Sequence, residues 1–325
     1  MKSLEHKLVD LFSPFIKPDL IQGLAVAVVN GDEAALVCLG YSNPSSKTIL
    51  SPKHYFELAS ITKTVVGILF SKMILEKRIT FETDCSCFWP ELKHMEVGKV
   101  TVLELLTHSS GISRLPSNLR PRNPMNPYFG YAYDDLMKEL LHLNIGPKKY
   151  LYSNLGFALL GKIIEIIYKD KVPNILRKEV LIPLDITEVK FSTDEESVPL
   201  TNVHSHEFEN VEHWVLNEFE AAGGMRATIQ QMKLFLVANV WPEKTLLKDA
   251  ILDSHKFLYF DGENKVGMAW HNGVKFGNIF HDGATYGSSS FIEFDPRKKT
   301  GIVILSNTYS EFKELVPAIN VCLDS

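Results

Sequence analysis

The sequence lacks the features that would place a protein in a membrane or on a nucleic acid. Its 325 residues contain no uncharged apolar run of the roughly 18 residues that a membrane-spanning helix needs. They contain no polybasic segment, and the net charge of −5 is opposite to the basic footprint of nucleic-acid-binding proteins. Repeats and low-complexity segments are also missing. With 45% hydrophobic and 22% charged residues, the composition predicts a globular protein with neither nucleic-acid nor membrane partners.

Cysteine is scarce, which limits both disulfides and metal sites. The chain has four: Cys38, Cys85, Cys87 and Cys322. Cys85 and Cys87 are too close in sequence to bridge easily, and a structural zinc site needs more Cys or His at tighter paired spacing. His204, His206 and His213 also lack a metal-binding pattern, so we interpret them as part of a polar surface segment. We therefore expect buried thiols in a reduced compartment, with no metal and no cofactor.

The first 20 residues do not have the pattern of a secretion signal. Apolar residues recur there with a helical period, but Glu5 and Asp10 interrupt the continuous apolar core that such a signal requires. The segment is typical of an amphipathic first helix. On this basis we expect a cytoplasmic protein.

Strand patterns lie near both ends of the chain, and helical patterns lie between them. Residues 23–29 and 34–39 are apolar runs that flank Asn30-Gly31, the strongest short signal for a β-hairpin. Four more strands are predicted in succession within 265–307. Helices are predicted at 58–78, 101–112, 134–143, 155–169, 228–240 and 311–322.

This arrangement predicts two lobes that meet at a cleft. We expect a sheet subdomain from residues 1–55 and 215–325, and a mainly helical subdomain from residues 56–214. Clefts between such lobes are the usual place for a ligand, so the active site is expected there. The stretch 113–133 is rich in Pro, Asn and aromatic residues and predicts a long functional loop.

One lysine occupies an unexpected place. In "FELASITKT", Ser60 and Lys63 are three residues apart at the start of an apolar helix and therefore share a face. Burying an ammonium group is costly unless something compensates. Ser60 at a helix start has both a hydroxyl that can attack and a backbone N–H without an intrahelical partner. Alone, this spacing is weak evidence, since a capping serine followed by an exposed lysine would produce it as well.

Two other segments supply groups that suit the same chemistry. Tyr152 and Asn154 are two residues apart just before a helix, so that in an extended segment both face one side. His281 stands at the end of a predicted strand, and Gly283 after it permits close backbone approach by a substrate.

Together these segments resemble the three motifs of the penicillin-recognising serine hydrolases. The residues are Ser60-Ile61-Thr62-Lys63, Tyr152-Ser153-Asn154 and His281-Asp282-Gly283. They are similar to the pattern S-x-x-K, Y-x-N, and K-T-G or H-x-G of the group that contains class C β-lactamases, D,D-carboxypeptidases and esterases, with His281 in the place of the third-motif Lys. "LLTHSSGI", "NLGFALLG" and "AAGGMRAT" extend the likeness in family order, over residues 20–310. The resemblance implies an α/β (α+β) fold of the β-lactamase/transpeptidase-like type, with an antiparallel sheet flanked by helices and an all-helical subdomain.

The resemblance also implies roles for individual residues. Ser60 would be the acylated nucleophile, and Lys63 and Tyr152 together would be its general base, with the lysine cation lowering the phenol pKa. Tyr152 would then protonate the leaving group and activate water. Asn154 would hold Lys63 and a substrate amide. His281, beside Tyr152, would shape proton transfer and substrate binding.

The third motif would also contribute to substrate binding. The backbone N–H groups of Ser60 and Ala284 would form the oxyanion hole, with Gly283 allowing the approach. Members active on β-lactams usually carry Thr or Ser where this chain has Asp282. An ionised Asp282 in the cleft would repel a substrate carboxylate and favour neutral or cationic substrates. Because strand side chains alternate, Asp282 could equally point away from the cleft.

Three other sets of residues were candidates with an ordinary structural explanation. His108 is expected to be a structural histidine at a helix end. The loop aromatics Tyr128, Phe129, Tyr131 and Tyr133 could line the cleft or pack the loop onto the body. Arg114, Arg120 and Arg122 could bind an anion, although a solvated loop explains them as well.

The sequence thus predicts a serine hydrolase that acts on an ester, an amide or a peptide through an acyl-enzyme. D-aminopeptidase-like, esterase-like, carboxypeptidase-like and weak β-lactamase activities are all compatible with it. Two alternatives are an acyltransferase with the same acyl-enzyme and a non-catalytic penicillin-binding-like homologue. The expected partner is a small-molecule or short-peptide substrate, and the sequence does not indicate the oligomeric state.

Overall fold

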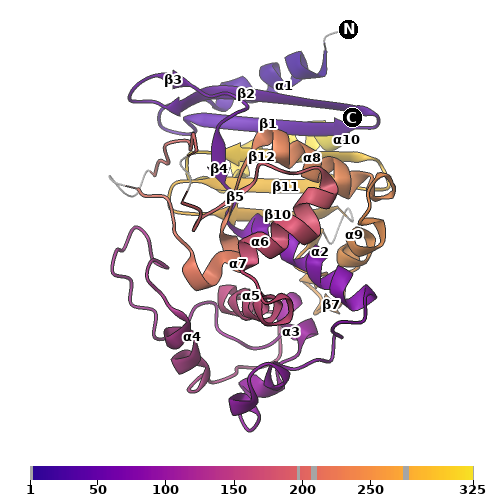
Figure 1. The fold of residues 1–325 in the computed structure, drawn as a ribbon. Helices are drawn as coiled ribbons and strands as arrows, with labels where there is room; N and C mark the ends of the chain where they lie inside the picture. Colours follow the sequence, from indigo (N-terminus) through magenta and orange to yellow (C-terminus); the bar gives the residue numbers. More distant parts are fainter. Residues whose placement is uncertain (1–2, 196–197, 206–210, 274–277, 325) are drawn as a thin grey trace.

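The structure is a computed structural model that describes residues 3–195, 198–205, 211–273 and 278–324. Its centre is an antiparallel sheet whose nine described strands run in the order β3-β2-β1-β12-β11-β10-β9-β8-β7 (Figure 1). These strands are β1 Gly23–Asn30, β2 Glu33–Asn43, β3 Thr48–Ile49, β7 Tyr259–Phe260, β8 Lys265–Val266, β9 His271–Asn272, β10 Ile279–Ala284, β11 Ser289–Asp295 and β12 Thr300–Ser306. A smaller sheet, in the order β4-β6-β5, contains β4 Tyr55–Glu57, β5 Lys190–Phe191 and β6 Met225–Thr228.

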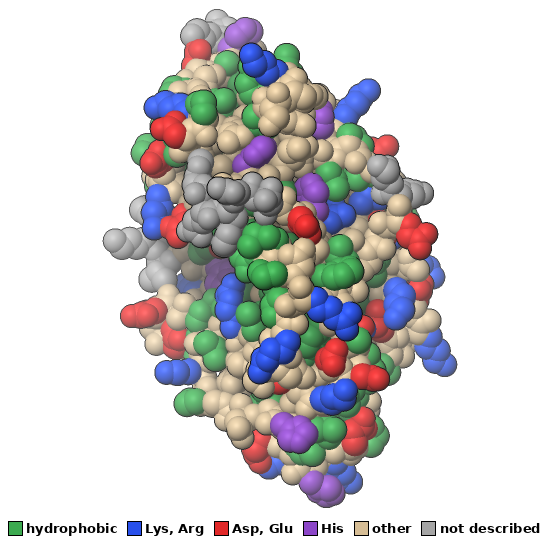
Figure 2. Space-filling view, turned by 90° about the vertical axis from the view of Figure 1, so that its left-hand side faces the viewer, with side chains coloured by type: hydrophobic (Ala, Val, Ile, Leu, Met, Phe, Trp, Pro, Cys, Tyr) green, Lys and Arg blue, Asp and Glu red, His purple; other side chains and the backbone are tan. Residues whose placement is uncertain are grey.

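Helices surround the large sheet and fill the space below it in Figure 1. They are α1 Leu4–Phe12, α2 Thr62–Leu75, α3 Val102–Leu106, α4 Tyr133–Leu140, α5 Asn154–Tyr168, α6 Val172–Leu176, α7 Glu220–Gly223, α8 Ile229–Val240, α9 Lys248–His255 and α10 Val316–Asp324. Among the described residues, no helix combines the length and apolar character required to cross a membrane. Basic and acidic side chains are interspersed on the face shown in Figure 2, without a broad region of one sign.

The first and last strands of the chain are neighbours in the large sheet. The predicted hairpin is confirmed, because β1 pairs with β2 from Gly23 opposite Gly40 to Asn30 opposite Glu33. Gly31 in its turn has φ +60°, a conformation in which glycine has no Cβ penalty. The other edge of β1 pairs with β12, from Leu24 opposite Ser306. The two ends of the chain therefore build one sheet, as their strand patterns indicate.

Alternating side chains bury both faces of this sheet. Leu24, Val26 and Val28 of β1 join a core that includes residues of α1 and α10. Ala25 and Ala27 point to the opposite face, into the larger core that α2, α5 and α8 share. Full burial of a Val or Leu side chain contributes about 1.5–3 kcal/mol. The two layers therefore hold the middle of the sheet rigidly on both sides.

The structure corrects several predicted elements. The helix predicted at 58–78 begins as a short 3₁₀ turn, Ala59–Ile61, and continues as α2. The helix predicted at 101–112 ends already at Leu106, although its capping box between Thr101 and Glu104 is confirmed by both hydrogen bonds. The strand predicted within 265–273 is two short strands, β8 and β9, because Ala269 has φ +71° and reverses the chain. Residues 113–132 form the expected long loop without helix or strand.

Candidate active site

Ser60 lies in the 3₁₀ turn that joins β4 to α2. The turn is anchored by a hydrogen bond from the backbone N–H of Leu58 to Met225 O, 2.9 Å long. Ala59 has φ +44°, an unusual conformation for a residue with a side chain. Such conformations persist where the surroundings enforce them, and they cluster at functional sites. Helix α2 supplies this support, since Val65, Val66 and most of its other side chains are buried.

Lys63, one turn along, is wholly buried, with 0% of its surface exposed. Its Nζ donates hydrogen bonds to Ser60 Oγ, 2.8 Å away, and to the backbone O of Ala222, 2.5 Å away. No carboxylate forms an ion pair with it among the described residues. Burial therefore lowers the pKa of Lys63 well below its usual value, and the nearby Arg114 lowers it further, while Asp282 opposes the shift. The site favours a neutral amine in contact with the serine hydroxyl.

Tyr152 completes the group around Ser60. It precedes α5, whose first residues are capped by Ser153, because Ser153 Oγ accepts from the backbone N–H of Gly156 at 2.8 Å. The phenol forms a side-chain hydrogen bond with Ser60, and its ring centroid lies 5.0 Å from Lys63 Nζ. Burial raises the pKa of Tyr152. We expected the Lys63 ammonium to lower the pKa of the phenol, and this is wrong. The low-dielectric surroundings disfavour both the Lys63 ammonium and the Tyr152 phenolate.

Asn154 does not hold Lys63 as expected. Its Nδ2 instead donates to Tyr128 Oη, 2.9 Å away on the long loop. Its Oδ1 is buried without a hydrogen-bond partner in the described part of the chain. Buried polar atoms rarely stay unpaired, and this acceptor lies in a residue that lines a cavity at Ser60. The Asn154 amide therefore keeps an unused hydrogen-bond acceptor beside this cavity in the described structure.

Strand β10 closes the other side of the site. A Cβ on Gly283 would lie 2.7 Å from the backbone N of Ser60 and 2.4 Å from Leu58 O, which is too close for any side chain. The strand can therefore lie against the serine turn only because residue 283 is glycine. Along β10, His281 is buried whereas Asp282 and Ala284 are exposed and line the cavity beside Ser60. The question of which way Asp282 points is thereby settled: it faces the cleft.

Two cavities meet at the serine. The larger, of about 390 Å³, is lined by Ser60, Arg114, Tyr150, Tyr152, His271, Phe280, Asp282, Gly283 and Ala284. The smaller, of about 70 Å³, is lined by Ala59, Ser60, Arg114, Tyr128, Asn154, Trp214, Leu216, Ala222, Gly223 and Ala284. Ser60, Arg114 and Ala284 belong to both.

His271 is a cavity residue that sequence reasoning missed. His281, the expected histidine, has 1% of its surface exposed and lines neither cavity, and its ring centroid lies 6.2 Å from that of Tyr152. His271 on β9 faces the larger cavity and its Nε2 hydrogen-bonds Tyr150 Oη at 2.9 Å. Burial lowers the pKa of His271 to about 4, so the imidazole is neutral at physiological pH. No local sequence signal marks this residue, because the pairing of β9 with β10 sets His271 opposite Phe280.

Among the other candidates, His108 has the structural role that was expected. Its Nδ1 accepts from the backbone N–H of Ser153 at 3.1 Å, which fixes the segment that carries Tyr152. The loop aromatics are divided: Tyr128 lines the smaller cavity, whereas Tyr131 packs its ring on Phe219.

The arginine and histidine candidates are also separated. Arg114 reaches the cleft, whereas Arg120 and Arg122 lie in a different hollow. Of the three histidines in the polar segment, His206 lies outside the described residues. In the described ranges, no cluster of three His, Cys, Asp or Glu side chains is arranged for a metal ion.

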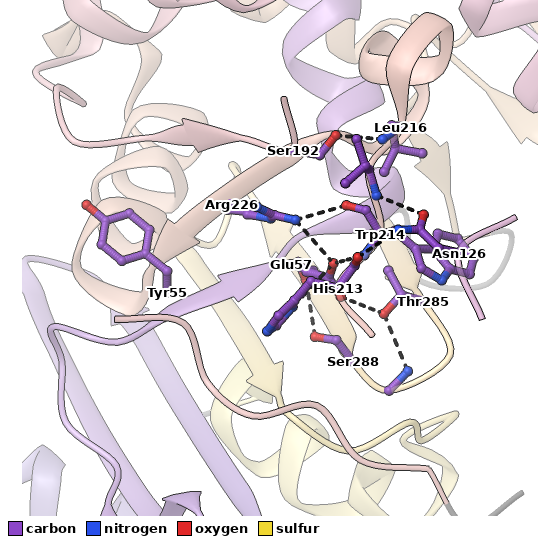
Figure 3. Close-up of polar contacts among 12 residues, drawn as sticks. Tyr55, Glu57, Asn126, Ser192, His213, Trp214, Leu216, Arg226, Thr285 and Ser288 are labelled. Atoms are coloured by element: carbon purple, nitrogen blue, oxygen red, sulfur yellow. Dashed lines mark hydrogen bonds and ion pairs between the residues drawn. The ribbon is translucent and has the colours of Figure 1, made fainter. Parts of the chain in front are cut away.

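A buried carboxylate supports the wall of the smaller cavity. Glu57, at the end of β4, has 4% of its surface exposed and accepts from Trp214 N at 2.7 Å and from Thr285 Oγ1 at 2.9 Å. Arg226 lies beside it and donates to Trp214 O at 2.9 Å. Figure 3 shows these partners converging on Glu57 from separate segments. Glu57 thus links Trp214, which lines the smaller cavity, to the turn that follows Ala284.

Comparison with known proteins agrees with this architecture. The sequence model described as Beta-lactamase matches residues 8–319. A solved class C beta-lactamase superposes with a TM-score of 0.84 at 21% identity, covering 99% of this chain and 96% of its own.

Two curated relatives match this chain over only part of their own length. "Protein flp" of Staphylococcus aureus (strain N315) is 25% identical over 92% of this chain, and the chain spans 62% of that protein. A "Beta-lactamase" of Providencia stuartii is 27% identical over 48% of this chain and 39% of its own length. The predicted fold is confirmed, and since the family match extends over nearly the whole sequence, the chain belongs to the beta-lactamase family.

Proposed function

We propose that this protein is a serine hydrolase that cleaves an ester, an amide or a short peptide through an acyl-enzyme on Ser60. The observation that carries the proposal is the 2.8 Å contact between Ser60 Oγ and the buried Nζ of Lys63. A hydroxyl becomes a nucleophile when an adjacent base takes its proton. A lysine whose pKa is lowered by burial can act as such a base.

The first step transfers one proton and forms one bond. The neutral Lys63 amine accepts the Ser60 proton while Oγ bonds to the substrate carbonyl carbon, and the carbonyl electron pair moves to its oxygen. The backbone N–H groups of Ser60 and Ala284 stabilise this oxyanion. When the intermediate collapses, the bond to the leaving group breaks and Tyr152 supplies that group with a proton. The Lys63 ammonium then returns its proton to Tyr152.

In deacylation, water replaces Ser60 as the nucleophile, and the same two residues transfer the proton. Tyr152 and Lys63 take a proton from water as it attacks the acyl carbon, and Ser60 leaves with that proton restored. Lys63 is the more direct base of the two, because burial lowers its pKa and raises the pKa of Tyr152. Asp282 in the cleft argues for esters, amides and peptides over β-lactams, whose carboxylate it would repel.

Covalent labelling tests the proposal. The protein is incubated with a fluorophosphonate and, separately, with a penicillin, and the modified peptide is mapped by mass spectrometry. We expect the fluorophosphonate adduct on Ser60, and weak or slow labelling by the penicillin. Ser60→Ala is the matched control and should take up neither probe. Absence of any adduct on Ser60 in the wild-type protein would contradict the proposed nucleophile.

A further inference from the structure

Two opposite charges that form no ion pair in the described part of the chain line the same cavity. Arg114 and Asp282 both border the larger cavity at Ser60, and both side chains are exposed to it. Neither forms an ion pair with any other residue in the described part of the chain. Charged side chains in a cleft usually find a protein partner, water or a ligand. The pair therefore indicates what kind of molecule the cavity accepts.

Arg114 is held in place although it belongs to a loop. Its backbone O accepts the N–H groups of Asn154 at 3.0 Å and Leu155 at 3.2 Å, the first donors of α5. Its guanidinium carbon lies 5.1 Å from the centroid of the Tyr152 ring. The cation is thus positioned beside the reacting groups, where both cavities meet.

Asp282 is positioned with similar rigidity by the sheet. It lies in the interior of β10, opposite Phe291 of β11. It borders the larger cavity only, whereas Arg114 also borders the smaller one. A substrate would therefore meet the anion inside the larger cavity and the cation at the junction.

We propose that the substrate is a small zwitterion, with an amine that pairs with Asp282 and a carboxylate that pairs with Arg114. This inference rests on the proposed acyl-enzyme function and specifies its substrate class. A molecule with only one of these charges would leave the other protein charge desolvated without a partner, which disfavours its binding. A free carboxylate is recognised well by a planar guanidinium, because both oxygens can accept hydrogen bonds.

Alanyl-lactate esters test this directly. They are prepared in the D and L configurations and in four end states: free, N-acetylated, C-amidated and capped at both ends. We expect kcat/KM of the wild-type enzyme for the free form to exceed that for either singly capped form by about tenfold. For each variant, kcat/KM for the free ester is divided by kcat/KM for each capped ester. A general loss of activity cancels in this ratio.

The variants separate the two charges. Asp282→Asn should abolish the preference for the free amine, and Arg114→Gln should abolish the preference for the free carboxylate. Arg114→Lys keeps the charge and should retain part of the carboxylate preference. Arg120→Gln, on the same loop but in a separate hollow, is the matched control and should keep both preferences.

The outcomes distinguish this inference from the function on which it rests. Equal kcat/KM for the free and doubly capped esters would overturn the zwitterion proposal and leave the acyl-enzyme intact. Failure to cleave the free ester, in an enzyme whose Ser60 still reacts with a fluorophosphonate, would also overturn it. Absence of a Ser60 adduct with every probe would instead contradict the proposed function.

Discussion

Lys63 Nζ lies 2.8 Å from Ser60 Oγ, and the lysine has no exposed surface. Removal of this amine should lower the activity without lowering the stability of the fold. We expect Lys63→Met to lower kcat/KM for an ester by about 10²–10⁴-fold, since the base is lost. The melting temperature should stay the same or rise, because a desolvated polar group is replaced by an apolar one. Steady-state kinetics and thermal unfolding measure the two effects. A variant that keeps its activity would contradict the role of Lys63.

The pH dependence should follow the Lys63 pKa. Only the neutral amine accepts a proton, so kcat/KM rises with pH up to this pKa and is then level. Arg114 lowers the pKa of Lys63 and Asp282 raises it. Arg114→Gln should therefore move the rise to higher pH and Asp282→Asn should move it to lower pH. Profiles with an uncharged ester measure this, with Arg120→Gln as control. Shifts in the same direction would contradict the assignment.

Gly283 should be intolerant of any side chain. In Gly283→Ala the new Cβ would meet Leu58 O at 2.4 Å and Ser60 N at 2.7 Å, both backbone atoms of the serine turn. We expect a loss of about 1–3 kcal/mol in the free energy of unfolding and a large fall in acylation rate. Gly273→Ala is the matched control, because its Cβ would lie 3.7 Å from its nearest neighbour. Denaturant unfolding and burst kinetics compare the two, and equal behaviour of both variants would refute the close approach.

Glu57 should stabilise the smaller cavity. Glu57→Ala removes the acceptor of Trp214 N and Thr285 Oγ1, which leaves buried donors unpaired. Each such donor costs about 1–3 kcal/mol. We expect a lower melting temperature and a change in the intrinsic fluorescence of Trp214. Thr285→Val removes only one of these bonds and should have a smaller effect, so the reverse order would count against the network.

Penicillin should become a better acylating agent when Asp282 is neutral. Asp282→Asn removes the negative charge that faces the cleft and leaves Arg114 to attract the carboxylate. The second-order rate of penicillin labelling should rise by about tenfold relative to the rate with a fluorophosphonate. The ratio of the two rates excludes a general change in the reactivity of Ser60. A ratio equal to that of the wild type would show that Asp282 does not exclude carboxylates.

The parts of the fold that could be predicted from sequence are those with a local physical cause. The hairpin at Asn30-Gly31 follows from turn geometry, and the Thr101–Glu104 capping box follows from helix-end hydrogen bonding. The grouping of Ser60, Lys63 and Tyr152 came from motif resemblance, since no local rule brings residues 60 and 152 together.

What could not be predicted depends on tertiary contacts. His271 reaches the cavity only through the pairing of β9 with β10. The amide of Asn154 pairs with Tyr128 because the long loop folds back over the site. Glu57 appeared as an ordinary strand residue, and its role requires Trp214 and Thr285, which are 157 and 228 residues away.

Rapid-quench intact-mass measurement during turnover of a p-nitrophenyl ester tests the acyl-enzyme on Ser60 most directly. We expect one acyl group per protein, located on Ser60 and formed at the rate of the p-nitrophenol burst. Lys63→Met should form it at least about 100-fold more slowly, because Ser60 then lacks its base. Turnover without any acylated Ser60, or an equal acylation rate in Lys63→Met, would contradict the acyl-enzyme mechanism with Lys63 as its base.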